Sequence, residues 1–301
     1  MTLSNLTIQR EYPNFPLPHS ARAPEGAFRP AGSFEPTAYP RLAHAVPPGI
    51  HRSGRYLVRF AQDLEDLRAV QALRFRIFNL ELSEGLLASY ETGLDSDEFN
   101  LSCHHLMVIE HATNSLVGTY RLMTSELGGR EDLYTATEFD LSSIPDSVIE
   151  RGAEVGRACV AKEHRNGRVL QLLWRGIARY LDWNDKRYVF GCCSVPTLEA
   201  SEIATVSRQL AEGNHFHPRY QAGVLAALRA PRSEAAASAE DAELPPLFNS
   251  YLRLGAKVCG GPALDREFGV TDYLVVLDLR DVEPRMLANL AAPGLWQSPA
   301  A

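Results

Sequence analysis

The chain has 301 residues, is 45% hydrophobic and carries a formal net charge of −7, which suffices for one large domain with a full core and argues against general nucleic-acid binding. No apolar run approaches the ~20 residues of a transmembrane helix, and the N-terminus lacks the charged and apolar regions of a signal peptide. The five cysteines show no CxxC spacing, so the sequence indicates neither a zinc site nor a disulfide framework, and reduced thiols in the cytoplasm are the default.

Residues 1–50 are predicted to form an extended or disordered leader, because they hold nine of the nineteen prolines and show no sustained periodicity. A short strand is expected at 56–60. An amphipathic helix then runs from Asp63, its N-cap, to about Phe78. Residues 81–102 form a loop with six acidic side chains and no Lys or Arg, and a loop of this length indicates a function.

Strands and helices alternate through the rest of the chain. The predicted central elements are a hairpin of strands 106–110 and 116–123 joined at 112–115, short helices or turns over 130–150, a strand at 154–160, a helix at 167–183, a strand at 188–194 and a helix at 199–212. The predicted C-terminal elements are a mobile low-complexity insertion at 231–246, a helix at 247–254 ended by Gly255, a strand at 270–279 and a tail at 286–301. This order predicts a mixed α/β sheet with helices packed on it.

A basic, Gly-containing loop at 161–168 joins the strand at 154–160 to the helix that follows. Backbone N–H groups at a helix N-terminus bind anions, and a glycine lets the backbone approach a phosphate closely. Arg168, Arg175 and Arg179 lie 7 and 4 residues apart and therefore share one helix face. Together with the acidic loop, this basic helix suggests two ligands of opposite charge. The alternative is ordinary surface patterning on a βα unit with a solvated face.

Five segments of the sequence resemble the Gcn5-related N-acyltransferase (GNAT) superfamily. Within it they are similar to the ornithine lipid-forming N-acyltransferases, a branch related to the acyl-homoserine-lactone synthases. In the family's order, the segments are 73–85, 94–108, 116–123, 154–165 and 244–279. The resemblance implies a single GNAT-like domain over residues 51–285, with a mixed, mostly antiparallel central sheet and helices on both faces.

The loop at 165–168 departs from the superfamily's pyrophosphate loop, which carries two glycines. Here only Gly167 is kept, and Arg168 stands where the first glycine is expected. The resembling branch uses acyl carrier protein, whose phosphopantetheine has one phosphodiester and no pyrophosphate. We therefore expect acyl carrier protein as partner and its acyl-phosphopantetheine as donor, rather than coenzyme A, with no cofactor. The residues expected to meet the phosphate and the acidic carrier protein are Lys162, Arg165, Gly167, Arg168, Arg175 and Arg179.

Attack of an amine on a thioester needs a base, donors for the carbonyl oxygen and a leaving thiolate. The resemblance implies Glu154 as the general base, and burial would have to raise its pKa from ~4.3. Arg157 is the second catalytic candidate: it could touch the phosphate, but a structural ion pair that neutralises Glu154 or braces the acidic loop is the better interpretation. The oxyanion donors are expected to be backbone N–H groups along 157–161.

The acidic loop supplies the candidates for holding an amino acid. Asp95, Asp97 and Glu98 are predicted to hold its cationic groups, with a solvated loop as the alternative. Arg74 is the candidate for its carboxylate, or for fixing the loop through Asp97. Arg121 completes the predicted substrate-binding set.

The histidines and cysteines give weaker signals. Cys192 and Cys193 could supply a hydrogen-bond donor to the leaving thiolate, although packing in the core is the better interpretation. The four histidines considered as acid/base groups, with a structural role as the alternative, are His104, His105, His215 and His217. We expect no metal site, because His215 and His217 lack a third ligand.

The resulting functional hypothesis is a cytoplasmic N-acyltransferase that moves a long, 3-hydroxylated acyl chain from acyl carrier protein to the α-amine of ornithine. The chain length and hydroxyl group come only from the resemblance. The product is a lyso-lipid, which suggests peripheral contact with the membrane. The alternatives are another amine such as glycine, an acyl-homoserine-lactone synthase, or a non-catalytic acyl-carrier or membrane-binding protein.

Overall fold

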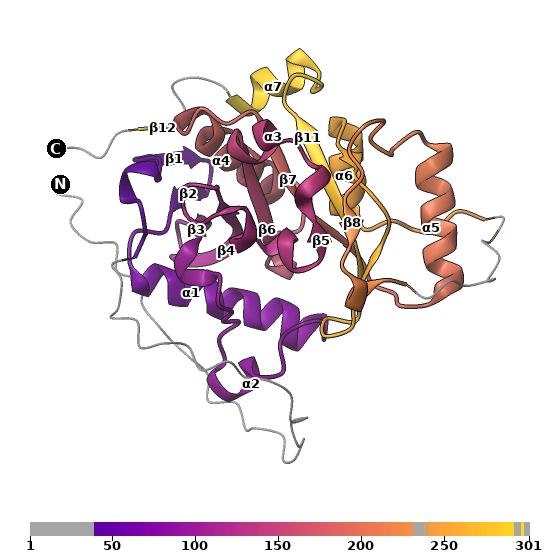
Figure 1. Cartoon of the computed structure of the whole chain (residues 1–301). Coiled ribbons are helices and arrows are strands. Elements are labelled where there is room, and N and C mark those ends of the chain that lie inside the picture. Colours follow the sequence, from indigo (N-terminus) through magenta and orange to yellow (C-terminus); the bar gives the residue numbers. More distant parts are fainter. Residues whose placement is uncertain (1–38, 231–237, 239, 292–295, 298–301) are drawn as a thin grey trace, which may run out of the picture.

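The computed structural model of the chain describes residues 39–230, 238, 240–291 and 296–297 (Figure 1). Most of the predicted leader, the greater part of the predicted insertion at 231–246 and much of the predicted tail lie outside these residues. The limits predicted for the domain therefore stay predictions.

One large sheet crosses the molecule, with the strand order β10-β11-β7-β6-β4-β3-β2-β1-β12 and with β9 beside β11. The strands are β1 (Ile50–Ser53), β2 (Tyr56–Phe60), β3 (His104–Glu110), β4 (Ser115–Met123), β5 (Phe139–Asp140), β6 (Gly152–Val160), β7 (Tyr188–Val195), β8 (Gly223–Val224), β9 (Lys257–Val258), β10 (Ala263–Asp265), β11 (Val270–Asp278) and β12 (Trp296–Gln297). Neighbouring strands run antiparallel except β6 and β7, which are parallel. The predicted mixed, mostly antiparallel sheet is confirmed.

Helices cover both faces of this sheet, as predicted (Figure 1). The α-helices are α1 (Leu64–Arg74), α2 (Ser89–Thr92), α3 (Asp146–Glu150), α4 (Arg168–Trp183), α5 (Ala200–Glu212), α6 (Pro246–Leu254) and α7 (Pro284–Ala291). Side chains of α4 and α6 share one hydrophobic core with alternate residues of the strands, and α1 closes a second core on the opposite face. Among the described helices, none combines the length and the apolar character of a membrane span.

The first helix begins where the sequence predicts. Asp63 accepts the backbone N–H of Asp66 at 2.9 Å and so caps α1. The chain continues without a break from α1 into a wider π-helical turn, η2 (Phe75–Glu81). This turn carries the chain to the acidic segment 81–102, which contains α2 and the short 3₁₀ turn η3 (Asn100–Ser102).

The chain end also differs from the expectation of a trailing tail. Residues 284–291 form α7, whose Leu287 and Leu290 are spaced three residues apart and pack against the core that α4 shares. Beyond it, β12 pairs with β1. In the described part of the C-terminal segment, α7 therefore packs on the α4 side of the sheet and β12 extends the sheet beside β1.

A wedge opens in the middle of the sheet between β6 and β7. Within the described chain the two strands pair only from Gly152 to Glu154, opposite residues 188–190, although β6 continues to Val160. Next along β6, Arg157 and Ala158 lie opposite the single residue Tyr120 of β4, which makes a β-bulge. The bulge and the early end of pairing leave one edge of β6 open.

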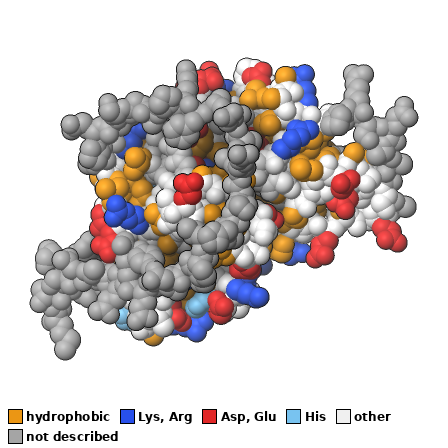
Figure 2. Space-filling view, turned by 90° about the horizontal axis from the view of Figure 1, so that it is seen from below, with side chains coloured by type: hydrophobic (Ala, Val, Ile, Leu, Met, Phe, Trp, Pro, Cys, Tyr) orange, Lys and Arg blue, Asp and Glu red, His pale blue; other side chains and the backbone are white. Residues whose placement is uncertain are grey.

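Figure 2 looks at the molecule from below Figure 1. In the described part of this face, acidic and basic side chains are scattered among hydrophobic ones instead of forming one charged field. The exposed hydrophobic side chains of the chain include Leu80, Leu82 and Leu87, the last of which is 74% exposed. These three leucines lie on η2 and the segment that follows it.

Candidate active site

A cavity of about 340 Å³ occupies the wedge between β6 and β7. Its polar lining includes Arg121 from β4, Glu154 and Arg157 from β6, Ser194 from β7 and Asp272 from β11. Its apolar lining comes from α6, from β4, β6 and β7, and from Phe78 of η2. The diverging strands therefore bring both predicted catalytic residues to one cavity, together with Arg121.

Glu154 is the last residue of β6 that pairs with β7, and it is buried with 6% exposure. Its two carboxylate oxygens accept the backbone N–H groups of Tyr134 and Thr135 at 2.8 and 2.7 Å. These donors lie in the 3₁₀ turn η5 (Tyr134–Thr137). Burial raises the pKa of Glu154, and the two hydrogen bonds and the charge of Arg121 offset part of that rise. A raised pKa makes Glu154 a stronger proton acceptor than an ordinary glutamate.

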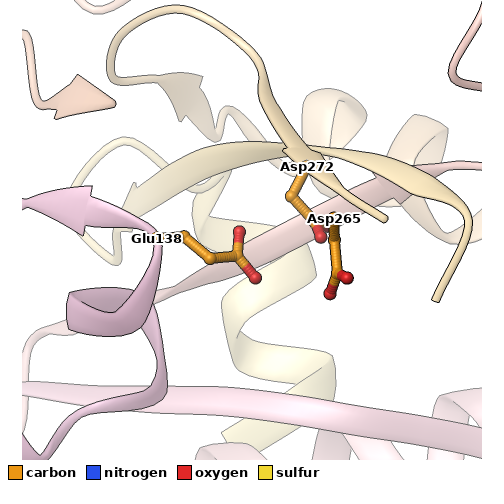
Figure 3. Close-up of side chains that lie close together, drawn as sticks. All are labelled: Glu138, Asp265 and Asp272. Carbon is orange, nitrogen blue, oxygen red and sulfur yellow. The ribbon is translucent and has the colours of Figure 1, made fainter. Parts of the chain in front are cut away.

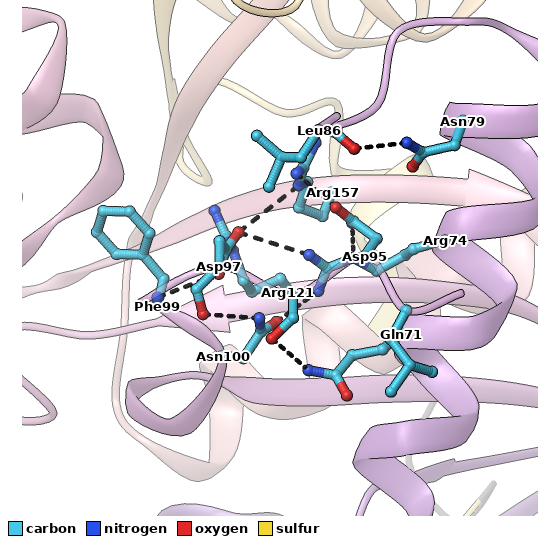
Figure 4. Close-up of polar contacts among 12 residues, drawn as sticks. Gln71, Arg74, Asn79, Leu86, Asp95, Asp97, Phe99, Asn100, Arg121 and Arg157 are labelled. Atoms are coloured by element: carbon cyan, nitrogen blue, oxygen red, sulfur yellow. Dashed lines mark hydrogen bonds and ion pairs between the residues drawn. The ribbon is translucent and has the colours of Figure 1, made fainter. Parts of the chain in front are cut away.

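Three arginines surround the two aspartates of the acidic loop, and we call this group the arginine–aspartate network (Figure 4). Asp95 accepts Arg74 Nε at 2.6 Å and Arg157 Nη2 at 2.8 Å. Asp97 accepts Arg121 Nη1 at 2.5 Å and lies 3.5 Å from Arg74 Nη2. Elements far apart in the chain, α1, β4 and β6, therefore meet at one loop.

The acidic loop was expected to face a substrate, but its two aspartates are paired with arginines. Arg74 and Asp95 are fully buried, and neither they nor Asp97 line the cavity. Burial raises the pKa of Asp97, but Arg121, Arg74 and Arg157 outweigh it and bring the pKa to about 2. The geometry favours the alternative in which Arg74 and Arg157 hold the loop. A direct contact of Asp95 or Asp97 with a substrate amine stays a prediction.

Asn100 is an uncharged partner of Arg74 in this network. Its side-chain oxygen accepts Arg74 Nη1 at 2.8 Å. Since an amide carries no charge, three arginines face only two carboxylates, which leaves one positive charge in excess. Glu98 is exposed and does not line the cavity, whereas Glu84 of the same loop lines it together with Glu154.

Arg121 and Arg157 carry the excess positive charge to the cavity wall. Arg157 adopts a left-handed backbone conformation (φ 50°) at the bulge, which is strained for a residue with a side chain. Its guanidinium lies over the rings of Phe78 and Phe268, 5.2 and 4.7 Å from their centroids. Arg121 lies over the ring of Tyr134 at 5.4 Å. Both cations are thus oriented by aromatic faces beside the cavity.

The basic loop of the sequence lies at the N-terminus of α4. Gly167 is the N-cap of this helix, with φ 81°, and it has no side chain to satisfy the first-turn N–H groups. Lys162 is exposed, and its side chain makes no polar contact within the described residues. Arg165 pairs with Glu81, and Arg168 donates to Ser53 Oγ at 2.8 Å. An anion at this helix end would meet free N–H groups and cationic side chains together.

Arg175 and Arg179 lie further along α4 and are half-buried. Arg179 lies 3.4 Å from Asp182 and over the ring of Trp183. None of the six residues predicted for the phosphate and carrier protein lines the cavity. The predicted contacts of these residues with the phosphate and the carrier protein therefore lie outside the cavity.

The structure adds three acidic residues that sequence analysis passed over, Glu138, Asp265 and Asp272, which we call the carboxylate cluster (Figure 3). One carboxylate oxygen from each lies within 4.8 Å of those of the others. Burial raises the pKa of Glu138 and of Asp272, and the neighbouring carboxylates raise both further. The available signal was Asp272, a buried acid near the start of a nine-residue strand that is mostly apolar up to its last residue, Asp278.

A pair of tyrosines also escaped the sequence analysis. Tyr120 Oη and Tyr251 Oη lie 2.5 Å apart, and both residues line the cavity. Burial raises the pKa of both hydroxyls, so they remain protonated at neutral pH. Tyr120 lies opposite the bulge, and Tyr251 comes from α6.

The histidines lie outside the cavity. His104 contacts the Tyr180 hydroxyl at 2.8 Å and the Arg41 carbonyl at 2.7 Å, and His105 contacts the Tyr39 hydroxyl at 2.9 Å. Burial lowers the pKa of His105 well below its usual value, so it stays neutral. The structural alternative therefore suits both residues.

Cys192 and Cys193 line the cavity, but burial raises the pKa of both thiols well above the usual value. All five cysteines of the chain are free.

Comparisons with known proteins show the family to which the chain is related. The acetyltransferase (GNAT) domain family matches residues 73–175, a span that includes Glu154 and the whole network. The L-ornithine N(alpha)-acyltransferase of Brucella abortus is 31% identical over 259 residues, covering 80% of this chain and 90% of that protein. The protein of the same name from Rhodobacter capsulatus is 33% identical, covering 74% and 90%. Among solved structures, the AHL synthase LasI aligns with a TM-score of 0.45 and 10% identity, covering 80% and 96%.

Asp95→Asn tests whether the network supports the fold. The variant leaves Arg74 and Arg157 without their shared buried counter-ion, and breaking such a pair typically costs about 3–5 kcal/mol of unfolding free energy. Urea denaturation should show a loss of that size. Glu98→Gln, an exposed carboxylate of the same loop, should change stability by less than about 0.5 kcal/mol. Equal stability of Asp95→Asn and the wild type would contradict a structural role for the pair.

Glu138→Gln tests the protonation of the carboxylate cluster. Because the folded pKa of Glu138 is raised, the folded protein holds a proton that the unfolded chain releases, and wild-type stability falls as pH rises through that pKa. Glutamine cannot ionise, so the variant should gain about 1–3 kcal/mol relative to the wild type between pH 5 and pH 8. Urea denaturation at both pH values measures this gain. An unchanged difference between the two proteins at pH 5 and pH 8 would show that Glu138 does not titrate in this range.

Proposed function

This chain belongs to the L-ornithine N(alpha)-acyltransferase family, and we propose that it transfers a long fatty acyl chain from a thioester donor to the α-amine of ornithine. The observation that carries the proposal is Glu154, a buried carboxyl with a raised pKa in a cavity between two diverging strands. The same cavity presents cationic side chains on one wall and an acidic side chain on another. These are the charges that an amino acid with an amine in its side chain requires.

In the proposed reaction, Glu154 takes a proton from the α-ammonium, directly or through a water. The free amine then attacks the thioester carbonyl, an N–C bond forms and the C–S bond breaks. The hydrogen bonds from Tyr134 and Thr135 hold the carboxylate in place while lone pairs remain for the incoming proton. General-base catalysis of this kind contributes about 10²–10⁴-fold.

The open edge of β6 is the proposed oxyanion site. Beyond Glu154 the described part of β7 no longer pairs with β6, so backbone N–H groups on that edge can face the carbonyl oxygen. Of the oxyanion donors predicted along 157–161, Ala161 is excluded, because its N–H already donates to the Val117 carbonyl at 2.8 Å. The bulge residues nearest Glu154 are the better donors.

The tyrosine pair is the proposed proton source for the leaving thiolate. Tyr120 and Tyr251 share a short hydrogen bond at the cavity wall and stay protonated when buried. The thiolate would take a proton from this pair, and the second proton that the attacking nitrogen loses as the amide forms would restore the pair through water. This role replaces the weaker suggestion that Cys192 or Cys193 serves the thiolate.

Acyl carrier protein is the proposed donor. At the N-terminus of α4 the Arg168 N–H donates to Asn166 Oδ1, and the first-turn N–H groups after it, beside the side chains of Lys162 and Arg168, suit a single phosphodiester. Exposed cations on the same loop also suit an acidic partner surface. The positions of Arg175 and Arg179 fit a carrier protein lying along the helix.

Peripheral contact with the cytoplasmic face of the membrane is also proposed. Leu82 both lines the cavity and is exposed, and Leu80 and Leu87 are exposed close to it in the chain. An apolar edge of this kind suits the release of a lipid product into a bilayer.

Incubation of the purified chain with labelled ornithine and a long-chain acyl-acyl carrier protein tests the proposed reaction. Mass spectrometry should detect N-acylornithine, and Glu154→Gln should lower kcat by about 10²–10⁴-fold because glutamine cannot accept the proton. Circular dichroism should show that the variant stays folded. A Glu154→Gln variant with near-normal kcat at neutral pH would remove Glu154 from the role of base.

A comparison of donors tests the role of the α4 N-terminus. We expect much faster turnover with acyl-acyl carrier protein than with acyl-coenzyme A of the same chain length. Arg168→Glu should mainly raise KM for the carrier protein, and the effect should weaken in high salt. Glu163→Gln on the same loop is the matched control. Equal kcat/KM for the two donors would contradict the assignment of acyl carrier protein as the donor.

A further inference from the structure

The carboxylate cluster lies beside the cavity and has no part in the proposed acyl transfer. Asp272 lines the cavity, and Glu138 and Asp272 are each only 2% exposed. Cys192 and Ser194, which also line the cavity, contact the cluster: the Cys192 thiol lies 3.5 Å from Glu138 Oε2, and the Ser194 hydroxyl donates to Asp272 Oδ1 at 2.6 Å. Two residues of the cavity wall therefore contact the carboxylate cluster directly.

These three carboxylates have no cationic partner. Within the described residues, no Lys, Arg or His forms an ion pair with Glu138, Asp265 or Asp272. Burying several unpaired carboxylates is costly unless they hold protons or a cation. Burial and the neighbouring carboxylates raise the pKa of Glu138 to about 8 and that of Asp272 to about 7, which favours their protonated forms.

A buried oxygen of Glu138 points to a missing ligand independently of the charge. Glu138 Oε1 is fully buried and has no hydrogen-bond partner among the described residues. Figure 3 shows the Glu138 carboxylate directed toward the carboxylates of Asp265 and Asp272. Orphaned buried oxygens are rare in folded proteins, so an absent donor is the simplest account.

The oxygens that remain lie at a spacing that suits a cation, either a metal ion or an ammonium group. Asp265 uses Oδ1 to accept the backbone N–H groups of Glu267 and Phe268, Asp272 uses Oδ1 for Ser194, and Glu138 uses Oε2 for Cys192. Asp265 and Asp272 therefore each keep one oxygen without a hydrogen bond inside the described chain, and Glu138 keeps Oε1, with the Tyr134 hydroxyl close enough to this carboxyl to lower its pKa. A primary ammonium has three N–H donors and no acceptor, so it pairs with three such oxygens.

We propose that the carboxylate cluster binds the side-chain ammonium of the amino acid acceptor and so selects ornithine over amino acids without a side-chain amine. This inference rests on the proposed function. Arg121 and Arg157 would hold the α-carboxylate, and Tyr134 stands between the two sites, since Arg121 lies over its ring and its hydroxyl interacts with Glu138. The α-amine is then left for Glu154.

Steady-state kinetics with ornithine and norvaline test the proposal, because norvaline has the same carbon chain and lacks the terminal amine. The wild type should use ornithine with a kcat/KM at least 10-fold above that for norvaline. Glu138→Gln and Asp272→Asn should each raise KM for ornithine by about 10- to 100-fold, the usual worth of a hydrogen bond to a charged group. Neither variant should change kcat/KM for norvaline more than a few-fold. Glu202→Gln, an exposed carboxylate on α5, is the matched control and should change neither substrate.

The outcomes separate this inference from the proposed function. Acylation of ornithine and norvaline with equal kcat/KM by the wild type would overturn the inference and leave acyl transfer intact. Acylation of neither would overturn both. If a variant fails to fold, the wild-type comparison of the two amino acids still decides. Calorimetric titration with Mg²⁺, Ca²⁺ or Mn²⁺ gives a further check: tight binding that Glu138→Gln abolishes would make the cluster a metal site and overturn its assignment to the ammonium.

Discussion

The site depends on one constraint in the sheet, the early separation of β6 from β7. The two strands approach so closely at the hinge that a Cβ at Gly191 would lie 2.3 Å from the Val155 carbonyl oxygen. Just beyond this point β6 bulges at Arg157, and its edge turns away from β7. The cavity forms because a backbone hydrogen-bond ladder is given up over this length. Such a loss inside a sheet is tolerated where a ligand can take the place of the missing strand partner.

Charge is distributed around this gap in two unbalanced groups. The arginine–aspartate network holds one positive charge more than its carboxylates neutralise, and the carboxylate cluster holds acidic groups that no cation pairs with in the described chain. Either imbalance alone would weaken the fold, since buried charges are expensive to desolvate. Together they face one cavity, and a zwitterion with an additional ammonium would satisfy both. Functional sites are where such local costs are expected to survive.

The sequence predicts the local elements well because they depend on local patterns. Helical spacing and the Asp63 cap predict α1, and alternation followed by a Gly-containing basic loop predicts β6 and α4. The resemblance leads to Glu154, and the alternative pairing of Arg74 with the acidic loop matches the network. The bulge at Arg157 has no local signature, since nothing in its neighbours requires a left-handed arginine. The carboxylate cluster joins residues 138, 265 and 272, and only the tertiary fold brings them within reach of each other.

The acidic loop illustrates how composition can mislead about a site. An excess of acids in sequence suggests a binding surface for amines, yet Asp95 and Asp97 are occupied by arginines from three other elements. Their effect on a ligand is therefore indirect, because they hold Arg121 and Arg157 in place at the cavity. This also bears on the identity of the amine. Glycine would engage the arginines and leave three carboxylates without a cation, whereas an amino acid with an amine at the end of its side chain would place its carboxylate at the arginines and its ammonium among the carboxylates. The charges around the cavity thus favour a diamino acid over a simple one, for reasons that concern the stability of the complex as much as the chemistry of transfer.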